Sequence, residues 1–577
     1  MRNLINKLLP KGSRRRFYAA KLMRKIGILR PEAIKYYEYV TALERAQIPL
    51  YPEPFKEDIK FSIIIPAYNT PDKYLQPLIK SILFQTYRNW QLIMVNASDD
   101  ESSRRISRLA ETDERIKVVN VKNKGISANT NAGIEHAKGE YIIFADHDDL
   151  LDHQALNEVR KAIAANPEAG LIYTDEDKVS EDGKQFSAPH FKPDWSPDLM
   201  NCVNYITHLV AVKKSIVDKV GPLDSEKDGA QDYDFLLRVI DSGTAIVHVP
   251  KVLYHWRKAD NSTAQSFDFK PEAAQAGVSS LREHLERQGV KGAVVENREK
   301  RPGFYKVIYK PAEEITIIIA PFASPRILKQ YVERFVTRAP FAETRTRLIL
   351  PSSFKLDSAL KKYTDPIEIV HIASQSEAGY IKASLEKATE NVLIINKLIM
   401  PKTGRWLNDL SGVISVNRIA AAAPIIVNDT NAVSDSGYVY EGEDLTKLFK
   451  GMSFTREATF FGNPEWCREV NGLTGSIALL RKSDFSQFIG KHEGIKNLAD
   501  MIKQFSIQKA KSGKDICIWS NVIFNDLTIT APRQNTEPRE KFNNSLVSYG
   551  DNFHIVSDEE AITNRLALVP VEDENYE

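Results

Sequence analysis

Asp146 and Asp148 stand two residues apart directly after the apolar run 141–145, and Asp149 adds a third carboxylate. In an extended segment, side chains two residues apart point to the same side. Clustered carboxylates raise one another's pKa unless a cation or a hydrogen-bond network neutralises them. Oxygen ligands of this kind suit Mg²⁺ or Mn²⁺, which take one or two carboxylates together with substrate phosphates and water. The pattern therefore predicts a divalent cation here, against the alternative that the aspartates only cap a following helix.

Two more apolar runs end in small or polar residues. Residues 61–65 are followed by Pro-Ala-Tyr-Asn at 66–69, and residues 92–95 by Asn-Ala-Ser-Asp-Asp at 96–100. Ligands of parallel sheets bind beyond the carboxyl ends of the strands. We therefore expect these two ends and the acidic segment at 146–149 to form one site.

Apolar runs alternate with segments of helical spacing over the first part of this region. We expect strands at 61–66, 92–95, 116–119 and 141–145, and helices at 74–87 and 127–137. Short strand–helix alternation gives right-handed βαβ units, and hence a parallel sheet covered by helices on both faces. The predicted fold class is α/β, with a mixed, mostly parallel sheet.

Several apolar segments recur about 250 residues later, a period too long for a solenoid. Residues 315–321 resemble 62–66, 390–395 resemble 140–145, and 477–483 resemble 209–215. A chain of 577 residues also needs more than one core. We expect a duplicated fold with four regions: a basic helical segment (1–60), a first α/β domain (61–300), a related second domain (301–530) and an acidic tail (531–577).

Bulk composition is that of a globular protein, with 42% hydrophobic and 27% charged residues and a net charge of +2. The first thirty residues hold many Lys and Arg and no acid, which fits either an anionic membrane surface or a solvated helix face. Cys202, Cys467 and Cys517 lie far apart, so neither a disulfide scaffold nor a zinc site is supported. No apolar run approaches the roughly 20 residues of a membrane span. We expect a cytoplasmic location, free or peripheral at the inner face of the cell membrane, and no nucleic-acid partner.

Seven segments in order carry a resemblance to a known family. They are 62–69 (SIIIPAYN), 125–133 (GISANTNAG), 145–149 (ADHDD), 173–178 (YTDEDK), 191–199 (FKPDWSPDL), 231–235 (QDYDF) and 254–257 (YHWR). With them, residues 61–265 resemble a family 2 glycosyltransferase of the GT-A fold, close to those of bacterial polysaccharide and O-antigen assembly. The resemblance implies a nucleotide diphosphate sugar as donor.

The resemblance also implies roles for single residues. It places the nucleotide sugar against Pro66, Ala67, Tyr68, Asn96, Asp99, Asn131, Asp146, Trp195 and Arg257. Asp148 and His255 would hold the metal, Asp146 would face the ribose, and Arg257 would pair with the diphosphate. In the family an acidic residue usually follows the second strand; here Asn96 stands there with Asp99 close by, which leaves the nucleobase open.

Asp232 matches the family's catalytic aspartate, a general base that takes the proton of the acceptor hydroxyl in an inverting transfer. Asn204, His208 and Asp234 are expected on the acceptor side. A diphosphate leaves without protonation, so one base and one metal suffice, whereas a glycoside hydrolase needs a second carboxylate. Structural roles are the alternative for these residues. Asp232 and Asp234 could be acids that favour a helix N-terminus, and Trp195 or a lone histidine could belong to the core.

The second copy is predicted to lack this chemistry when the repeats are set side by side. Asn396 falls opposite Asp146, Leu398 opposite Asp148, Asn497 opposite Asp232, and 525–527 (Asn-Asp-Leu) opposite 255–257. Leucine cannot ligate a metal, and asparagine cannot act as a base at neutral pH. We expect a non-catalytic GT-A-like domain that binds acceptor, supports self-association or braces the first domain.

The predicted function is an inverting, metal-dependent glycosyltransferase that acts on a glycan or lipid-linked acceptor in bacterial cell-surface polysaccharide synthesis. A sugar nucleotidyltransferase is the first alternative, but it would need a Gly-rich, basic loop where residues 67–71 read Ala-Tyr-Asn-Thr-Pro. A non-catalytic nucleotide-sugar or glycan binding protein is the second. It would suit the second domain, but not the first, in which Asp148, Asp232 and His255 occur together.

Overall fold

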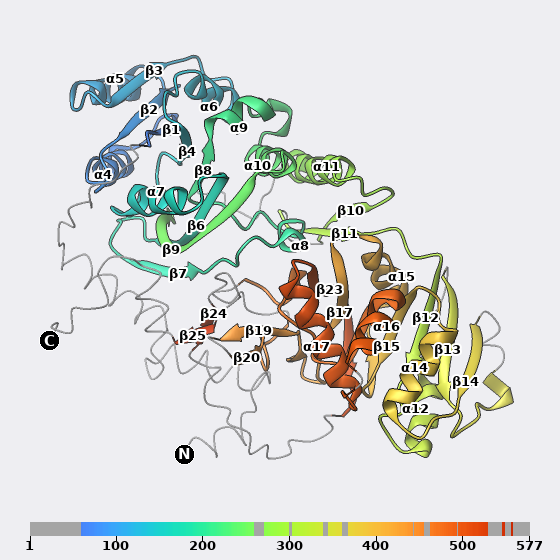
Figure 1. The fold of residues 1–577 in the computed structure, drawn as a ribbon. Coiled ribbons are helices and arrows are strands. Elements are labelled where there is room, and N and C mark those ends of the chain that lie inside the picture. Colours follow the sequence, from blue (N-terminus) through green and yellow to red (C-terminus); the bar gives the residue numbers. More distant parts are fainter. Residues whose placement is uncertain are drawn as a thin grey trace, which may run out of the picture.

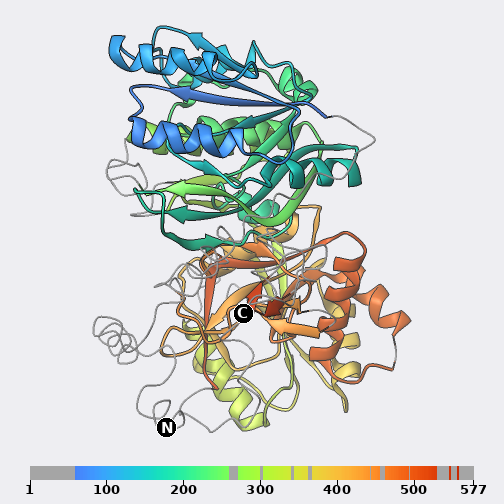
Figure 2. The same ribbon diagram turned by 90° about the vertical axis from the view of Figure 1, so that its left-hand side faces the viewer.

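The computed structural model describes residues 59–258, 271–298, 303–338, 344–360, 367–441, 444–454, 462–492 and 494–528, and two short strands, β24 (Ser545–Val547) and β25 (Ile555–Ser557). The basic N-terminal segment and most of the acidic tail lie outside these residues. The described chain forms two halves, each built around one large sheet (Figure 1; Figure 2). Among the helices described, none combines the length and the apolar character that crossing a bilayer requires.

The first sheet has nine strands. Its order is β3-β2-β1-β4-β8-β6-β9-β5, with β7 paired to β6. The strands are β1 (Phe61–Ala67), β2 (Trp90–Asn96), β3 (Ile116–Asn120), β4 (Tyr141–Phe144), β5 (Leu150–Leu151), β6 (Ala169–Val179), β7 (Phe186–His190), β8 (Val210–Lys213) and β9 (Ala245–Arg257). β3, β2, β1 and β4 run parallel, as do β6 and β9, while β8 is antiparallel to β4 and β6.

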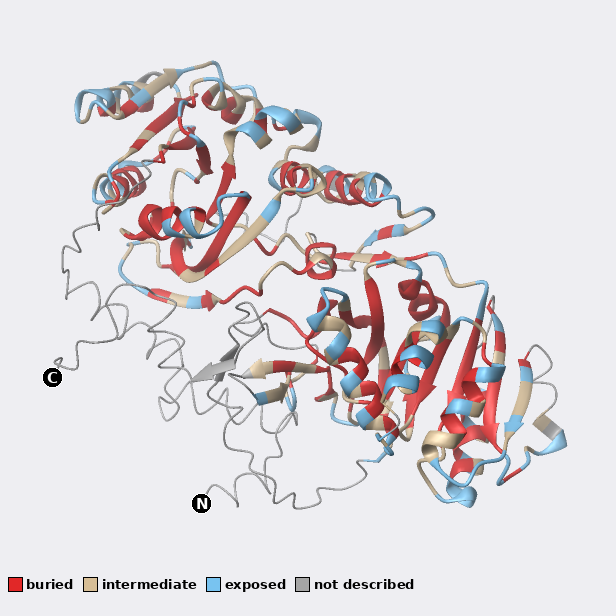
Figure 3. Ribbon diagram, in the orientation of Figure 1, coloured by how far each residue is buried: buried red, intermediate tan, exposed pale blue. Residues whose placement is uncertain are grey.

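Helices cover both faces of this sheet. They are α4 (Asp72–Leu83), α5 (Asp100–Ser107), α6 (Ile126–Ile134), α7 (Ala155–Ala165), α8 (Pro197–Met200), α9 (Lys214–Val220), α10 (Gln231–Asp241) and α11 (Pro271–Arg287). Ile63 and Ile65 belong to one core with α4 and α7, and Ile64 belongs to the other core with α9 and α10. Burial on alternate sides explains why β1 is apolar apart from Ser62 and buried at every position (Figure 3).

The second sheet repeats the first strand for strand. Its order is β14-β13-β12-β15-β22-β17-β23-β16, with β18 paired to β17, and its parallel and antiparallel pairs follow the same sequence. The strands are β12 (Glu314–Ile319), β13 (Arg345–Pro351), β14 (Ile367–Ile372), β15 (Asn391–Ile395), β16 (Ile399–Pro401), β17 (Ile419–Val427), β18 (Val433–Asp435), β22 (Ile477–Arg481) and β23 (Asp515–Asp526). The predicted duplicated α/β fold with mixed sheets is therefore confirmed.

The remaining elements of the second half flank its sheet. The helices are α12 (Pro325–Arg338), α14 (Glu377–Lys387), α15 (Trp406–Ser411), α16 (Lys482–Lys491) and α17 (Leu498–Lys511). β19 (Tyr438–Glu441) and β20 (Asp444–Lys447) form a hairpin, and β21 (Arg468–Glu469) pairs with β23. The four 3₁₀ turns are η1 (Arg108–Glu111), η2 (Ser225–Lys227), η3 (Ser358–Leu360) and η4 (Gly412–Ser415).

The two halves meet through α8 and a short hairpin of β10 (Val294–Asn297) and β11 (Tyr305–Ile308), which lie between the sheets in Figure 1. Tyr305 stacks on Tyr233 of α10, with ring centroids 5.2 Å apart, and Phe304 stacks on Trp466 of the second half at 5.6 Å. One apolar core runs from the inner face of the first sheet through this hairpin into the second sheet. The halves are thus packed together rather than merely tethered.

Candidate active site

The acidic loop Asp146–Asp149 follows β4, at the carboxyl edge of the parallel strands. Asp149 is fully buried, and it accepts hydrogen bonds from the Tyr254 hydroxyl at 2.6 Å and the Arg257 backbone N–H at 2.7 Å. Asp146 is exposed and Asp148 is half-buried. Asp149 therefore ties the loop to β9, while the first two carboxylates remain at the surface of the site.

Charge repulsion is built into this loop. Burial raises the pKa of Asp148, and the charge of Asp146 adds to that rise. Burial and both neighbouring carboxylates raise the pKa of Asp149 well above its usual range. The described residues contain no cluster of three or more His, Cys, Asp or Glu side chains arranged around a metal. Asp146 and Asp148 nevertheless fit Mg²⁺ or Mn²⁺, which need only one or two carboxylates when substrate phosphates and water complete the shell.

His255 and Arg257 both have partners within the protein, and Arg257 lies against the acidic loop. The His255 ring contacts the Asp177 carboxylate at 2.6 Å, and Arg257, 1% exposed, donates to the backbone carbonyl groups of Asp148 and Glu181. Neighbours in a strand point to opposite faces, so the motif 254–257 splits into two pairs. The predicted metal contact of His255 and diphosphate contact of Arg257 stay predictions, because a metal-binding histidine commonly pairs its other ring nitrogen with a carboxylate, and one terminal nitrogen of Arg257 has no hydrogen-bond partner in the described part of the chain.

Asp232 lies in the first turn of α10, near the acidic loop. The Asn204 amide donates to it at 3.1 Å, and its carboxylate lies within electrostatic range of Asp146 and His208. The carboxylate has protein on several sides, although the residue is still open to solvent. Burial raises the pKa of Asp232, the charge of Asp146 raises it further, and the Tyr233 N–H and His208 oppose the rise. The structure thus brings together four of the predicted site residues.

The acceptor side is only partly as predicted. The His208 ring stacks on Tyr254 at 4.8 Å, which places it between the acidic loop and Asp232. Asp234 is buried and forms an ion pair with Arg238 at 2.8 Å, and Arg238 also donates to the carbonyl groups that follow α9. The predicted acceptor contact of Asp234 is therefore corrected: its helical position turns it away from Asp232, into the packing of α9 on α10.

At the other end of the site, Pro66 and Ala67 close β1 as buried residues, and Tyr68 is 53% exposed beside them. Asn96 is 1% exposed, and its amide group donates to the Ser103 carbonyl and hydroxyl and to Asn120. These bonds join the ends of β2 and β3. Asn96 thus has a structural environment instead of the predicted open contact with a nucleobase.

Asp99 is exposed to solvent, whereas the Asn131 side chain is occupied by contacts within the protein. Asp99 is exposed and exchanges hydrogen bonds with Asn69: its carboxylate accepts from the Asn69 amide at 2.9 Å. Asn131 binds both backbone polar groups of Leu223, at 2.8 and 2.9 Å. Asn131 therefore holds the loop before η2 in place of the predicted donor contact, and Asp99 is the acidic group that faces solvent near Tyr68.

Lys192 is a residue of the site that the sequence analysis missed. Its fully buried ammonium group contacts Glu176 at 3.1 Å and the backbone carbonyl oxygens of Ile206, Thr207 and His208 at 3.3, 2.8 and 2.7 Å. Glu176 in turn accepts the His208 N–H. The pair therefore fixes the backbone that presents His208. The available signal was Glu176 and its neighbouring carboxylates inside the otherwise apolar strand β6, because charges at such positions are rarely buried without a partner.

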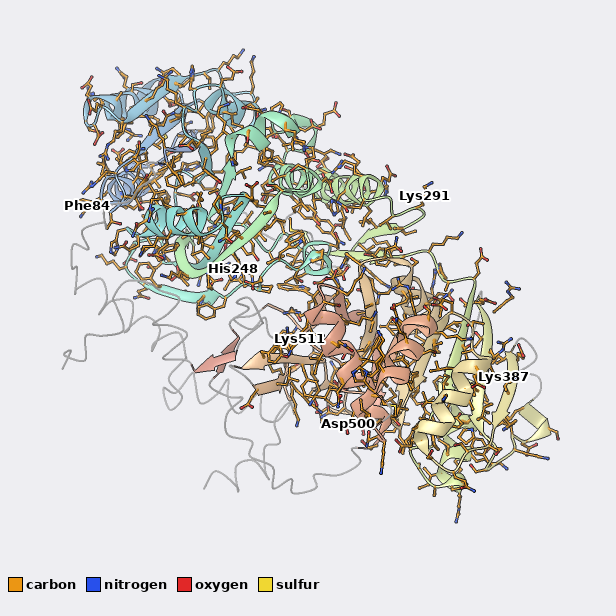
Figure 4. The ribbon with its side chains drawn as sticks, in the orientation of Figure 1. Phe84, His248, Lys291, Lys387, Asp500 and Lys511 are labelled. Atoms are coloured by element: carbon orange, nitrogen blue, oxygen red, sulfur yellow. The ribbon has the colours of Figure 1, made fainter. Side chains whose placement is uncertain are left out.

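His248 of β9 (Figure 4) is a second buried charge of this kind. Its ring lies between the carboxylates of Asp175 and Asp194, 3.0 Å from each, and stacks on Tyr173. Burial alone would lower the pKa of His248, but the two carboxylates outweigh it and raise the pKa. Asp194 directly precedes the half-buried Trp195, so this contact holds the segment that carries the predicted sugar-side tryptophan.

The second sheet has none of these charges in the same register. Where β6 carries the buried residues 175–177 (Asp-Glu-Asp), β17 carries 425–427 (Ile-Ile-Val). Ile518 takes the place of His248, and Asn525 the place of His255. The fold therefore forms without this row of buried charges.

One predicted correspondence between the halves shifts. Ile502 lies as many residues before the start of β23 as Asp232 lies before the start of β9. The helices that carry them, α17 and α10, also end equally far before these strands. Ile502, fully buried, thus takes the place of Asp232. Asn497 instead caps α17, accepting the N–H groups of Ala499 and Asp500. The misalignment arose because α17 has 14 residues and α10 has 11.

Comparison with known proteins agrees with this site. Residues 62–221 match the family model described as glycosyl transferase family 2. The O-antigen biosynthesis protein RfbC of Myxococcus xanthus is 29% identical over 470 residues, 79% of this chain and 36% of that protein. The uncharacterized protein y4gI of Sinorhizobium fredii (strain NBRC 101917 / NGR234) is 43% identical over 231 residues, 39% of this chain and 25% of that protein. The chain thus spans well under half the length of either curated relative.

Solved structures show a weaker likeness. The mannosyltransferase PcManGT from Pyrobaculum calidifontis, in complex with GDP-Man and Mn²⁺, is 18% identical, covering 46% of this chain and 74% of that chain, with a TM-score of 0.31.

Proposed function

We propose that this chain, whose residues 62–221 belong to glycosyl transferase family 2, transfers a sugar with inversion from a nucleotide diphosphate sugar to an acceptor hydroxyl. The observation that carries the proposal is the position of Asp232, hydrogen-bonded to Asn204 and within electrostatic range of Asp146 in the acidic loop. A base and a diphosphate-binding loop therefore share one site.

Asp232 is the proposed general base. Its raised pKa brings it closer to the working pH than that of an ordinary aspartate, which favours proton transfer in the transition state. The acceptor oxygen attacks the anomeric carbon, Asp232 takes the hydroxyl proton, and the bond from that carbon to the diphosphate oxygen breaks. Asn204 orients the base through the hydrogen bond from its amide group.

The acidic loop is the proposed place of the donor diphosphate. Asp148, with Asp146, would hold Mg²⁺ or Mn²⁺, which when bound neutralises charge on the leaving nucleotide diphosphate. Asp149 and Tyr254 keep these carboxylates at the strand edge. Tyr68 and Asp99 are the exposed groups at the end where the nucleobase would pack.

The acceptor is proposed to be a glycan or a lipid-linked sugar of the bacterial cell surface. The support is the similarity to the O-antigen biosynthesis protein RfbC, together with the half-buried Trp195 near the acceptor side. Contact of the basic N-terminus with an anionic membrane, and self-association through the second domain, stay predictions.

The test is a panel of nucleotide sugars with Mn²⁺ or Mg²⁺, in which release of the nucleoside diphosphate is measured with and without a mixture of glycan acceptors. Asp232→Asn should lower turnover by about a hundredfold or more, the effect of losing a general base. A metal-dependent thermal shift with the same nucleoside diphosphate should persist in the variant, because the base does not bind the donor.

Asp218→Asn is the matched control, since this exposed aspartate of α9 pairs only with Lys214 in the same helix. It should leave turnover unchanged. Full turnover in Asp232→Asn would contradict the base assignment. Metal-dependent nucleotide binding by the unaltered chain, without turnover of any donor, would favour the non-catalytic binding protein.

A further inference from the structure

Two charged residues of the second half reach into the first half at α8. The Arg418 guanidinium, just before β17, contacts the Asp198 carboxylate through both terminal nitrogens. Glu469 of β21 accepts the Ser196 hydroxyl and, at 3.1 Å, the Asp198 backbone N–H. Arg418 also binds Glu469 at 3.1 Å and Asp515 at 2.7 Å, so one guanidinium holds three carboxylates together.

This cluster lies at the contact between the two halves, termed here the joint, and it does not recur at the equivalent positions of the first half. The position of Arg418 in the first half is held by Glu168, and that of Asp515 by Ala245. β21, which carries Glu469, has no counterpart among the described strands of the first sheet. Asp198 and Glu469 are buried, 1% and 5% exposed. Buried charges of this kind cost desolvation energy and contribute little net stability, so stability alone does not explain them.

The segment held in this way leads directly to the proposed base. The Met200 carbonyl oxygen, at the end of α8, accepts the Tyr233 hydroxyl at 2.8 Å, and Tyr233 is the neighbour of Asp232 on α10. Four residues beyond Met200, Asn204 donates to the Asp232 carboxylate. Residues 196–204, termed here the α8 segment, thus bind the second half at one end and the base at the other.

We propose that Arg418 and Glu469 are positioning residues: through the α8 segment, the second half sets the place of Asn204 against Asp232. This gives the second half a part in the reaction of the first without any catalytic group of its own. The inference rests on the proposed function for its effect on turnover, but not for its effect on the α8 segment itself.

The first measurement is hydrogen–deuterium exchange of the full chain, because it does not depend on activity. In Glu469→Leu, amide exchange in peptides covering residues 196–204 should become about ten- to a hundredfold faster, the effect of losing hydrogen bonds to a charged group. Glu469→Gln keeps an oxygen for the Asp198 N–H and should stay within about threefold of the unaltered chain. Arg418→Lys keeps the positive charge but loses the two-pronged guanidinium contact, so its exchange rate should fall between those of the two Glu469 variants. It replaces Glu469→Leu if that variant does not fold.

The second measurement is turnover of whichever nucleotide sugar shows Asp232-dependent release of nucleoside diphosphate with Mn²⁺. In Glu469→Leu, kcat should fall about ten- to a hundredfold while the KM for the donor changes little, because misplacing a group by about 1 Å has this effect. Lys306→Met is the matched control. It breaks another ion pair at the joint, with Asp409 at 2.9 Å, without touching the α8 segment, and it should alter neither exchange there nor kcat.

The outcomes separate the two proposals. If no donor is turned over by the unaltered chain, the proposed function fails, and exchange of the α8 segment still decides whether the second half holds it. Unchanged exchange in both Glu469→Leu and Arg418→Lys overturns the inference. The inference is also overturned if kcat falls as much in Lys306→Met as in Glu469→Leu, because the effect would then come from any weakening of the contact between the halves.

Discussion

Replacing Lys192 with methionine removes a buried ammonium group and keeps most of the length of the side chain. Burial alone would raise the pKa of Glu176, but the Lys192 ammonium, 3.1 Å away, together with nearby histidines, lowers it from 4.5 to about 2. A fall of that size corresponds to about 3 kcal/mol of stability at neutral pH, part of which is offset because burial lowers the pKa of Lys192. Removing one partner of a buried ion pair costs about 3–5 kcal/mol of stability. We expect a loss of this size in Lys192→Met.

The pH dependence gives this prediction its sign. Because the folded-state pKa of Glu176 is depressed, its contribution is fully present above the unfolded value near 4.5 and is lost as the pH falls through about 2. Urea unfolding at pH 7 and at pH 3 should therefore show the difference between Lys192→Met and the unaltered chain shrinking in acid. The double variant Glu176→Gln/Lys192→Met leaves neither charge of this pair unpartnered and should recover most of the lost stability.

Lys251→Met is the control for this experiment, because Lys251 pairs with Glu158 at 2.7 Å at a more open place. It should cost less than Lys192→Met, because the Lys251 ammonium group is partly exposed and Glu158 keeps a second partner, Lys161, at 3.0 Å. The reasoning is refuted if the single and double Lys192 variants are equally destabilised, or if the loss in Lys192→Met is as large at pH 3 as at pH 7.

Three further predictions concern the site. In the metal-free chain the Asp232 carboxyl should titrate above the usual aspartate range, because burial and the charge of Asp146 raise its pKa, and Asp146→Asn should move this titration to lower pH, as followed by NMR; a titration that stays in place would contradict the coupling. His255→Asn, which copies the second half, should keep the metal-dependent thermal shift with nucleoside diphosphate, whereas loss of that shift would identify His255 as a ligand. Gly125→Ala should lower Tm, since Gly125 has φ +99° and an added methyl would lie 2.6 Å from a carboxylate oxygen; an unchanged Tm in a melting experiment would show that the loop adapts.

The elements of the first sheet were predictable because its strands are buried on both faces. Continuous apolar runs then mark strands without ambiguity, and the runs at 61–66, 92–95, 116–119 and 141–145 all coincide with strands. Helix ends were less predictable. The helix expected to reach residue 87 ends at Leu83, since the Gln85 side chain turns to bind the Asp152 carbonyl oxygen 67 residues away in sequence.

The placement of site residues was predictable where they lie within one loop, as for Asp146 and Asp148 at the end of β4, although their roles stay predictions. They were not where contacts come from distant segments. Asn96 stands at a strand end like a ligand-binding residue, but its partner Asn120 comes from the next strand; Asn131 is held by a residue 92 positions further on. A motif read as a unit also misleads within a strand, because Tyr254 and its neighbour His255 face opposite sides.

The second half supplies an internal comparison that no single domain offers. It builds the same strand order with aliphatic residues at 425–427, so the carboxylates at 175–177 and their cationic partners are not requirements of the fold. Apolar residues of similar size are often as stable as a buried ion pair. What these charges do in the first half is hold polypeptide: Lys192 holds the backbone that presents His208, and His248 holds the segment before Trp195. These buried ionisable groups of β6 and β9 therefore hold segments that lie around Asp232, and the charged cluster at Arg418 extends the same principle across the contact between the halves.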